Sequence, residues 1–594
     1  MREGRFIIRI GFITLLAAVL TGVCIRSLWV ISSSGSTVTS RIISSERVER
    51  APRGDIFDRN GRVLAGSRMI FSVRVEHEVW TKGDTLQKLV RLRGILSPFG
   101  FTLDKIPEDG VVARDIPRET AEIIEKNRLM LSGVEVYTEP QREYEGIAAH
   151  VVGRAGGIYK EEYERLKDEG YGINDIVGKD GIELVYEGYL RGNDGKSTVE
   201  LDEAGRVIGI LDKTLMIPGD NVVLTIDSEL QRVLEDLLCS TIEGLKTDAG
   251  GAAVAIEVKS GEILAMASYP TYNAMTFSRD YSELASDPRA PLFNRAISGL
   301  YAPGSVFKML TAVAGLESGA ITTETKILDE GIYKAYEESG YAPSCWLYRK
   351  SGDTHGLLDV IGAIKNSCNY FFYETGRRTG IKAISDYARL FGLGEKTGIE
   401  LPGESKGSLA SPGNRAESGG VWYDGDTLGA SIGQSDHLFT PLQLASYIAA
   451  LTNGGVRYKP HIVKQILDGA DGAVIYESIP EIASIVPMDR ENIEAVLEGM
   501  REVTEDGTAS AAFRDYPIEV GGKTGSVQVS SQEADNGLFA AFAPFNDPEV
   551  AIVIVAEKAG TGGSLGGIAR GFFDACFGLY EPESNISSEN GYLP

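Results

Sequence analysis

Cysteine and histidine are scarce in this sequence. Each occurs five times in 594 residues, and cysteines spread this thinly exclude a dense disulfide framework. No histidine lies in a recognisable serine-hydrolase motif, so none is expected to serve as a catalytic base. Long basic runs are also missing, and the formal net charge of −25 argues against nucleic acid as a partner. The chain has no internal repeat.

Apolar residues are plentiful and suffice for more than one core. They make up 43% of the chain, and we therefore expect two folded domains. Residues 10–31 form a predominantly apolar run of about 22 residues, enough to cross a bilayer. Arginines precede this run, so the positive-inside rule places residues 1–9 in the cytoplasm and the rest outside. A cleaved signal peptide, ending in the small residues at 32–36, is the alternative.

Ser305 and Lys308 form an S-x-x-K pair at the start of a predicted helix. A helix-breaking stretch at 301–304 precedes Ser305, and an apolar run at 306–314 follows it. Free N–H groups at a helix N-terminus stabilise negative charge beside a nucleophile. Lys308 lies one turn on, and burial lowers the pKa of a lysine so that it can accept a proton. Ser305 is the candidate nucleophile and Lys308 the candidate base, although Ser305 taken alone also fits an ordinary helix N-cap.

A second polar pair, Ser367 and Asn369, interrupts an otherwise apolar helical region. We expect these residues to form a loop wall of a cleft. The Ser367 hydroxyl can relay a proton between Lys308 and a leaving amine, and the Asn369 amide can bind a peptide substrate.

The third run, Lys523-Thr524-Gly525, is followed by Ser526 and a β-rich stretch. Glycines here allow close backbone approach, and an extended peptide can pair with such a strand. Lys523 and Thr524 are expected to hold a substrate carboxylate. The backbone N–H groups of Ser305 and Ser526 are expected to form the oxyanion hole.

The order of these three runs is that of penicillin-binding proteins and serine β-lactamases. Further motifs extend the likeness from Arg53 to Cys576, and on them the chain resembles a class B penicillin-binding protein of the elongation type. These motifs are R-G-D-I-F-D-R-N-G (53–61), R-E-Y (142–144), A-H-V-V-G (149–153), G-K-D-G-I-E (178–183) and T-P-L-Q-L-A (440–445). Glu145 stands where the family has a proline.

The resemblance implies an α+β fold with an uncleaved anchor in the plasma membrane and an extracytoplasmic catalytic domain. Hairpins at 252–268 and 538–556, with the strand at Lys523, predict a five-stranded antiparallel sheet flanked by helices. The expected parts are a cytoplasmic tail at 1–9, an anchor at 10–31, a non-catalytic pedestal at 37–217, a transpeptidase domain at 218–582 and a disordered tail at 583–594.

The resemblance also implies a D,D-transpeptidase that crosslinks peptidoglycan stem peptides during cell-wall elongation, with β-lactams as inhibitors and no required cofactor. A SEDS-family glycan polymerase and proteins of the elongation complex are the implied partners. A division- or sporulation-type transpeptidase is the alternative. A β-lactamase or carboxypeptidase is disfavoured because no E-x-x-L-N run, the deacylating element of class A enzymes, follows the S-x-N motif. A noncatalytic scaffold is disfavoured because all three catalytic motifs are complete.

Soft metal ligands gather near the S-x-N run. Cys345, Asp353, His355 and Cys368 supply thiolate, carboxylate and imidazole groups within a short span, a set suited to tetrahedral zinc. A partly buried free thiol with a surface histidine is one alternative, and a Cys345–Cys368 disulfide is another. The sequence leaves all three open.

Overall fold

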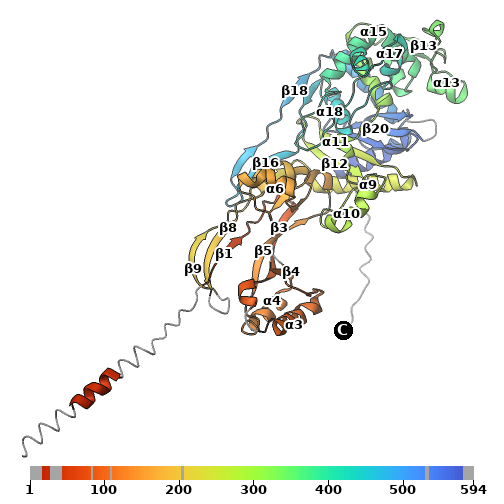
Figure 1. Ribbon diagram of the computed structural model, residues 1–594. Helices are drawn as coiled ribbons and strands as arrows, with labels where there is room; N and C mark the ends of the chain where they lie inside the picture. Colours follow the sequence, from red (N-terminus) through yellow and green to blue (C-terminus); the bar gives the residue numbers. More distant parts are fainter. Residues whose placement is uncertain are drawn as a thin grey trace, which may run out of the picture. The chain divides into compact units, whose positions relative to one another are not determined.

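A computed structural model describes residues 17–26, 43–81, 84–107, 110–201, 207–528 and 534–579 (Figure 1). Residues 17–26 form a helix. The rest of the predicted anchor, the predicted cytoplasmic tail and the predicted tail at 583–594 lie outside the described residues. Within the described ranges, no helix has both the length and the apolar character needed to cross a membrane.

The chain folds into two compact units whose segments alternate along the sequence. The first unit is built from the described residues of 1–50, 69–139 and 194–216, and the second from those of 51–68, 140–193 and 217–594. The sequence predicts one boundary near residue 218, with one domain before it and one after it. The compact units differ from this division, because the segments 51–68 and 140–193, which precede residue 218, fold with the second unit.

A three-stranded sheet and a small helical core form the first unit. Strand β8 (Gly195–Leu201) lies between β1 (Ile43–Glu49) and β9 (Val207–Thr214) and is antiparallel to both. Helices α3 (Thr85–Leu96) and α4 (Arg118–Lys126) pack together around a core that includes Trp80, Leu92 and Ile124. The other elements are α2 (His77–Trp80), η1 (Ser97–Phe99) and β4 (Val111–Ile116).

A buried ion cluster joins sequence-distant segments of the second unit. Glu183 has no exposed surface, and its carboxylate accepts hydrogen bonds from Arg53 Nη2 and Arg142 Nε, each at 2.6 Å. Arg53 also pairs with Glu187 at 2.7 Å, and Arg142 Nη1 donates to the Gly54 carbonyl at 2.8 Å. Three motifs that are far apart in the sequence, around residues 53, 142 and 183, therefore meet at one carboxylate.

A five-stranded antiparallel sheet forms the centre of the second unit (Figure 1). Every neighbouring pair in it is antiparallel. Strand β21 is apolar and buried at all positions, as expected of a central strand that is covered on both faces. The order is β12 (Ile263–Tyr269), β11 (Gly251–Glu257), β21 (Val550–Ala556), β20 (Asn536–Ala543) and β19 (Gly521–Val527). These strands lie where the sequence predicts them.

Helices pack against this sheet and position the site. Helix α9 (Ser228–Gly244) contacts β12, α18 (Pro441–Thr452) contacts β11 and β21, and α19 (Arg490–Glu505) contacts β19. Helix α18 is buried at every residue, so it forms the core of this unit. Strand β19 is last in the sheet order, so it pairs with a single strand, β20, within the part of the chain that the structure describes. It also contacts the short 3₁₀ turn η3 (Gly304–Phe307).

Shorter elements complete the second unit, and β3 (Val63–Val75) and β5 (Val134–Tyr144) have residues in both units. The shorter elements are β2 (Ile56–Phe57), α5 (Ala149–Val152), β6 (Ala155–Gly157), α6 (Lys160–Leu166), η2 (Lys167–Glu169), β7 (Ile176–Gly178), α7 (Gly181–Val185), α8 (Glu187–Leu190), β10 (Asn221–Leu224), α10 (Phe277–Ser286), α11 (Arg295–Ser298), η4 (Glu337–Ser339), α13 (Trp346–Ser351), α16 (Pro412–Glu417), α17 (Asp424–Ser431), β15 (Val456–Tyr458), β16 (Val463–Leu467), β17 (Val474–Glu477), β18 (Ile482–Ile485), α20 (Ser510–Phe513), η5 (Gly562–Leu565) and α21 (Gly566–Cys576).

Candidate active site

Ser305 lies in the 3₁₀ turn η3, directly before helix α12 (Lys308–Glu317). Gly304 adopts a left-handed φ of +52°, and a Cβ there would lie 2.7 Å from a methyl group of Val527, so this position requires glycine. The turn is thereby held against β19. Lys308 is the first residue of α12 and has no exposed surface, so its amine is directed into the protein close to the serine.

Ser367 and Asn369 lie at the junction of α14 (Val360–Lys365) and α15 (Asn369–Leu390). Ser367 has a left-handed φ of 52°, a conformation that costs free energy in a residue other than glycine and occurs often at functional sites. Its hydroxyl donates to Ser305 Oγ at 2.9 Å. Lys308 Nζ donates to the Ser367 carbonyl and to Asn369 Oδ1, each at 2.7 Å, and to Ser367 Oγ at 3.2 Å.

Strand β19 brings the third motif to the same place. Lys523 is fully buried, and its Nζ donates to Ser367 Oγ and to the Thr524 carbonyl, each at 3.0 Å. A Cβ on Gly525 would lie 3.2 Å from the Pro303 carbonyl, so glycine permits the close approach of β19 to the serine turn. Ser526 Oγ accepts a hydrogen bond from the Gly562 N–H at 3.4 Å.

The five predicted catalytic side chains therefore form one hydrogen-bonded group, and the predicted substrate-binding residues lie on the adjoining strand. The Ser367 hydroxyl is the centre of the group, because it contacts the Ser305 hydroxyl and both lysine amines. A proton can pass between Ser305 and Lys308 through this hydroxyl.

Neither buried lysine has an acidic partner. In the part of the chain that the structure describes, the polar partners of Lys308 and Lys523 are hydroxyl, carbonyl and amide oxygens, and no carboxylate lies within ion-pair distance of either amine. Burial lowers the pKa of Lys308 to about 8. Burial, together with repulsion from Lys308, lowers the pKa of Lys523 well below its ordinary value. With this pKa, Lys308 is neutral in about one tenth of molecules at pH 7 and in about one half at pH 8, so a neutral form is available to act as a general base.

A serine hydroxyl that is hydrogen-bonded to a second serine and, through it, to two buried lysines has the arrangement of a serine acyl-transfer site of the S-x-x-K type. The sequence model of the family "Penicillin binding protein transpeptidase domain" matches residues 251–573. That of the family "Penicillin-binding Protein dimerisation domain" matches residues 48–224. The chain belongs to the penicillin-binding protein transpeptidase family.

Proteins of known function and structure resemble nearly the whole chain. Peptidoglycan D,D-transpeptidase MrdA of Escherichia coli (strain K12) is 30% identical over 614 residues, which cover 96% of this chain and 94% of that protein. The penicillin-binding protein PBP2 of Helicobacter pylori, solved in complex with MreC, superposes with a TM-score of 0.74 at 26% identity, covering 91% of this chain and 99% of that one. A chain of a peptidoglycan synthase complex gives a TM-score of 0.75 at 27% identity, covering 98% and 99%.

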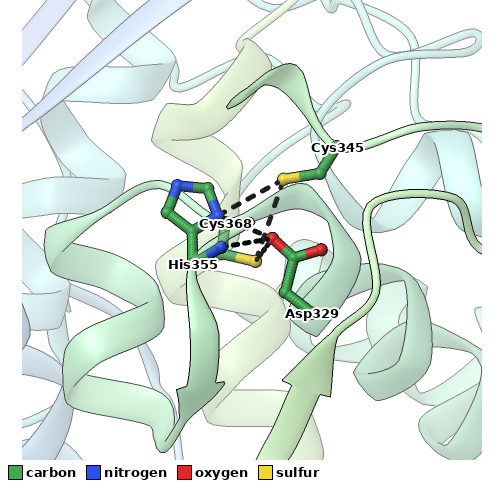
Figure 2. A group of neighbouring side chains, drawn as sticks. All are labelled: Asp329, Cys345, His355 and Cys368. Carbon is green, nitrogen blue, oxygen red and sulfur yellow. Dashed lines mark hydrogen bonds and ion pairs between the residues drawn. The ribbon is translucent and has the colours of Figure 1, made fainter. Parts of the chain in front are cut away.

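A second polar cluster lies directly behind the S-x-N motif. Figure 2 shows Asp329, Cys345, His355 and Cys368 directed toward one another, and their ligand atoms all lie within 4.8 Å of each other. The prediction that Asp353 belongs to this ligand set is wrong, because Asp353 is exposed and lies outside the cluster. Asp329 takes its place, since β13 (Ile327–Asp329) pairs with β14 (Gly356–Leu358) and sets Asp329 opposite Gly356, beside His355.

The two thiols of this cluster are free in the structure. Cys345 Sγ and Cys368 Sγ lie 3.9 Å apart, well beyond the roughly 2.05 Å of a disulfide, so the disulfide alternative is not formed. Both cysteines and Asp329 are buried, and His355 Nδ1 lies 2.7 Å from Asp329 Oδ2. The hydrogen bond between the thiols lowers the pKa of Cys345 and raises that of Cys368.

Sequence reasoning did not identify Asp329 or Thr508 as site residues. Asp329 reaches the cluster because its strand pairs with residues about thirty positions further along the chain. The spacing of residues near Asp329 does not predict this pairing. The Thr508 hydroxyl lies 2.8 Å from the Thr524 hydroxyl. The only local signal for Thr508 is its place in a Gly-Thr turn after an amphipathic helix.

Proposed function

We propose that this chain is a peptidoglycan D,D-transpeptidase of cell-wall elongation. Neutral Lys308 accepts the Ser305 proton through the Ser367 hydroxyl, and Ser305 Oγ bonds to the carbonyl carbon of the penultimate D-alanine. The bond to the terminal D-alanine breaks, and the proton held by Lys308 passes to the leaving amine. An amine of a neighbouring stem peptide then attacks the ester, which forms the crosslink and restores Ser305.

The observation that carries this proposal is the contact of the Ser367 hydroxyl with Ser305 and with the buried amines of Lys308 and Lys523. Asn369 and the edge of β19 would bind the donor peptide, and Lys523 and Thr524 its carboxylate. The N–H groups of Ser305 and Ser526 would stabilise the oxyanion. The likeness to MrdA supports an elongation role over the division-type alternative.

We also propose the environment and partners of the enzyme. Residues 10–31 would anchor it in the plasma membrane, with residues 1–9 in the cytoplasm and the catalytic unit outside. The match to a chain of a complex for "polymerization and crosslinking" supports a SEDS-family glycan polymerase as partner. The match to a PBP2 solved with MreC supports an elongation-complex partner of that kind.

Intact mass spectrometry with benzylpenicillin tests the proposed reaction. The full-length chain and its Ser305→Ala variant are incubated with the drug and weighed at intervals. A long-lived adduct of one drug molecule on the wild type, and none on the variant, is expected. A transient adduct with hydrolysed drug would indicate a β-lactamase, and an adduct that persists on Ser305→Ala would remove Ser305 as the nucleophile.

We further propose that the cluster of Asp329, Cys345, His355 and Cys368 binds a structural zinc ion. Tetrahedral zinc with bonds of about 2.3 Å to sulfur and about 2.0 Å to nitrogen separates two sulfur ligands by about 3.8 Å and sulfur from nitrogen by about 3.5 Å. The corresponding distances are 3.9 Å between the sulfurs and 3.6 Å from Cys345 Sγ to His355 Nδ1, so the sulfur and nitrogen donors fit. His355 Nδ1 and Asp329 Oδ2 lie 2.7 Å apart, closer than the roughly 3.3 Å between two tetrahedral ligands, so zinc would replace this hydrogen bond and move Asp329 outward.

The zinc would only hold its four protein ligands together and would take no part in the acyl transfer. Cys368 accepts the Phe371 N–H at the start of α15, so a metal bond to it would steady the turn that holds Ser367 and Asn369. Metal analysis of the purified chain is expected to give one zinc per molecule, lost in Cys345→Ser. A metal-free wild type with two reactive thiols at these positions would contradict the proposal.

A further inference from the structure

Thr508 contacts the strand that carries the K-T-G motif without belonging to any of the three motifs. Its hydroxyl oxygen lies 2.8 Å from that of Thr524. Thr508 is exposed and Thr524 is partly exposed, so this pair of hydroxyls faces solvent at the edge of the site. The pair can therefore be reached by a ligand that lies along β19.

The backbone around Thr508 is fixed from both sides. Thr508 lies between α19 (Arg490–Glu505) and α20 (Ser510–Phe513). The N–H of the next residue, Ala509, donates to the Val503 carbonyl at 3.0 Å, and Thr504 donates to the Val520 carbonyl just before β19. Ala509 is 2% exposed. The hydroxyl of Thr508 is thus held beside Thr524 by packed structure and not by a loose loop.

Hydrogen-bond counting assigns a direction to this contact. Each threonine hydroxyl has one proton, and a carboxylate only accepts. If Thr524 donated to Thr508, it would have no proton left for a carboxylate bound to it. If Thr508 donates to Thr524, the Thr524 proton is free for a carboxylate, and the donated bond makes Thr524 a stronger donor.

We propose that Thr508 is a positioning residue for recognition of the terminal carboxylate of the donor peptide, because it donates to Thr524 Oγ and turns the Thr524 proton toward that carboxylate. This inference rests on the proposed transpeptidase function. It names a residue outside the three motifs that contributes to selection of substrates ending in a free carboxylate. Ser305, Lys308 and Ser367 are not its contacts, so the chemical step itself does not depend on Thr508.

Acylation by a pair of β-lactams tests the proposal. The second-order rate of acylation of the full-length chain is measured by intact mass with benzylpenicillin and with its methyl ester, for wild type, Thr508→Val and Thr508→Ser. Thr508→Val has nearly the shape of threonine but no hydroxyl. Loss of one hydrogen bond is expected to slow benzylpenicillin acylation about three- to tenfold and to leave acylation by the ester unchanged. Thr508→Ser is expected to keep the wild-type rate.

A double variant separates positioning from general disturbance. In a Thr524→Val background, Thr508→Val is expected to have no further effect on benzylpenicillin acylation, because the hydroxyl it orients is already gone. Equal slowing with the drug and the ester, or no slowing with either, would overturn the proposal. Absence of any adduct on the wild type would overturn the proposed function, and this inference with it.

Discussion

Two buried cationic sites in the second unit differ in what their cations contact. Arg53 and Arg142 surround the carboxylate of Glu183, which has no exposed surface. Lys308 and Lys523 surround the Ser367 hydroxyl, and among the described residues their hydrogen-bond partners are all neutral. We call these groups the paired site and the unpaired site.

The consequences for charge are opposite. Burial of Glu183 works against its charge, but Arg53 and Arg142 outweigh burial and hold its pKa below the ordinary value. The carboxylates of Glu183 and Glu187 likewise raise the pKa of Arg53 despite burial. At the unpaired site, burial outweighs the opposing effect of the Cys368 and Cys345 thiols and lowers the pKa of Lys308 to about 8. The paired site therefore stabilises the fold, and the unpaired site supplies a base.

The largest expected effect is loss of the base from the unpaired site. Lys308→Met keeps the volume of the side chain and removes the amine, so benzylpenicillin acylation is expected to fall about 10³-fold. Lys365→Met is the matched control, because Lys365 pairs with Glu502 and Asp506 and its pKa is raised. A rate for Lys308→Met within threefold of wild type would remove Lys308 as the base.

At the paired site, a substitution is expected to lower the stability of the fold and not to act on the chemistry directly. Glu183→Gln leaves two buried arginines without a carboxylate and is expected to lower the free energy of unfolding by about 3–5 kcal/mol, seen as a lower denaturation midpoint. The exposed pair of Arg62 and Glu229 offers the control Glu229→Gln, which is expected to leave the denaturation midpoint nearly unchanged because solvent screens the pair. Equal midpoints for the two variants would contradict the account.

The paired site also predicts a pH dependence of stability. Because folding lowers the pKa of Glu183, its stabilising contribution is fully present above the pKa of an unfolded glutamate, about 4.3. It is lost progressively as the pH falls from there through the lower pKa of the folded state. The wild-type midpoint is expected to fall more steeply in acid than that of Glu183→Gln. Parallel curves for the two proteins would remove this contribution.

A single isosteric change can convert the unpaired site into a paired one. Asn369→Asp places a carboxylate where Asn369 Oδ1 now lies, 2.7 Å from Lys308 Nζ. An opposite charge at this distance is expected to raise the pKa of Lys308 by about 1–3 units, and the midpoint of the acylation rate against pH moves up with it. Asn369→Ala adds no charge and is expected to keep its midpoint near that of the wild type, whatever its rate. An unmoved midpoint in Asn369→Asp would contradict this account.

How much the sequence predicts differs between the site and its surroundings. That the five side chains lie together was predictable, because Ser305 and Lys308 are local neighbours and the three motifs have a recognisable order. The five strands were predictable because apolar runs such as β21 have a clear pattern. Glu183, Asp329 and Thr508 act through contacts with residues far away in the sequence, and local pattern contains no information about such pairing. The interleaving of the two units has the same cause.

The pH dependence of benzylpenicillin acylation in the wild type tests the central claim most directly. If the unpaired Lys308 is the base, the rate follows its neutral fraction, about one tenth at pH 7 and about one half at pH 8. The account predicts a rate that rises with pH and levels off, with a midpoint near the Lys308 pKa of about 8. A rate that does not change between about pH 6 and pH 9.5, or a midpoint near the ordinary lysine value of about 10.4, would contradict it.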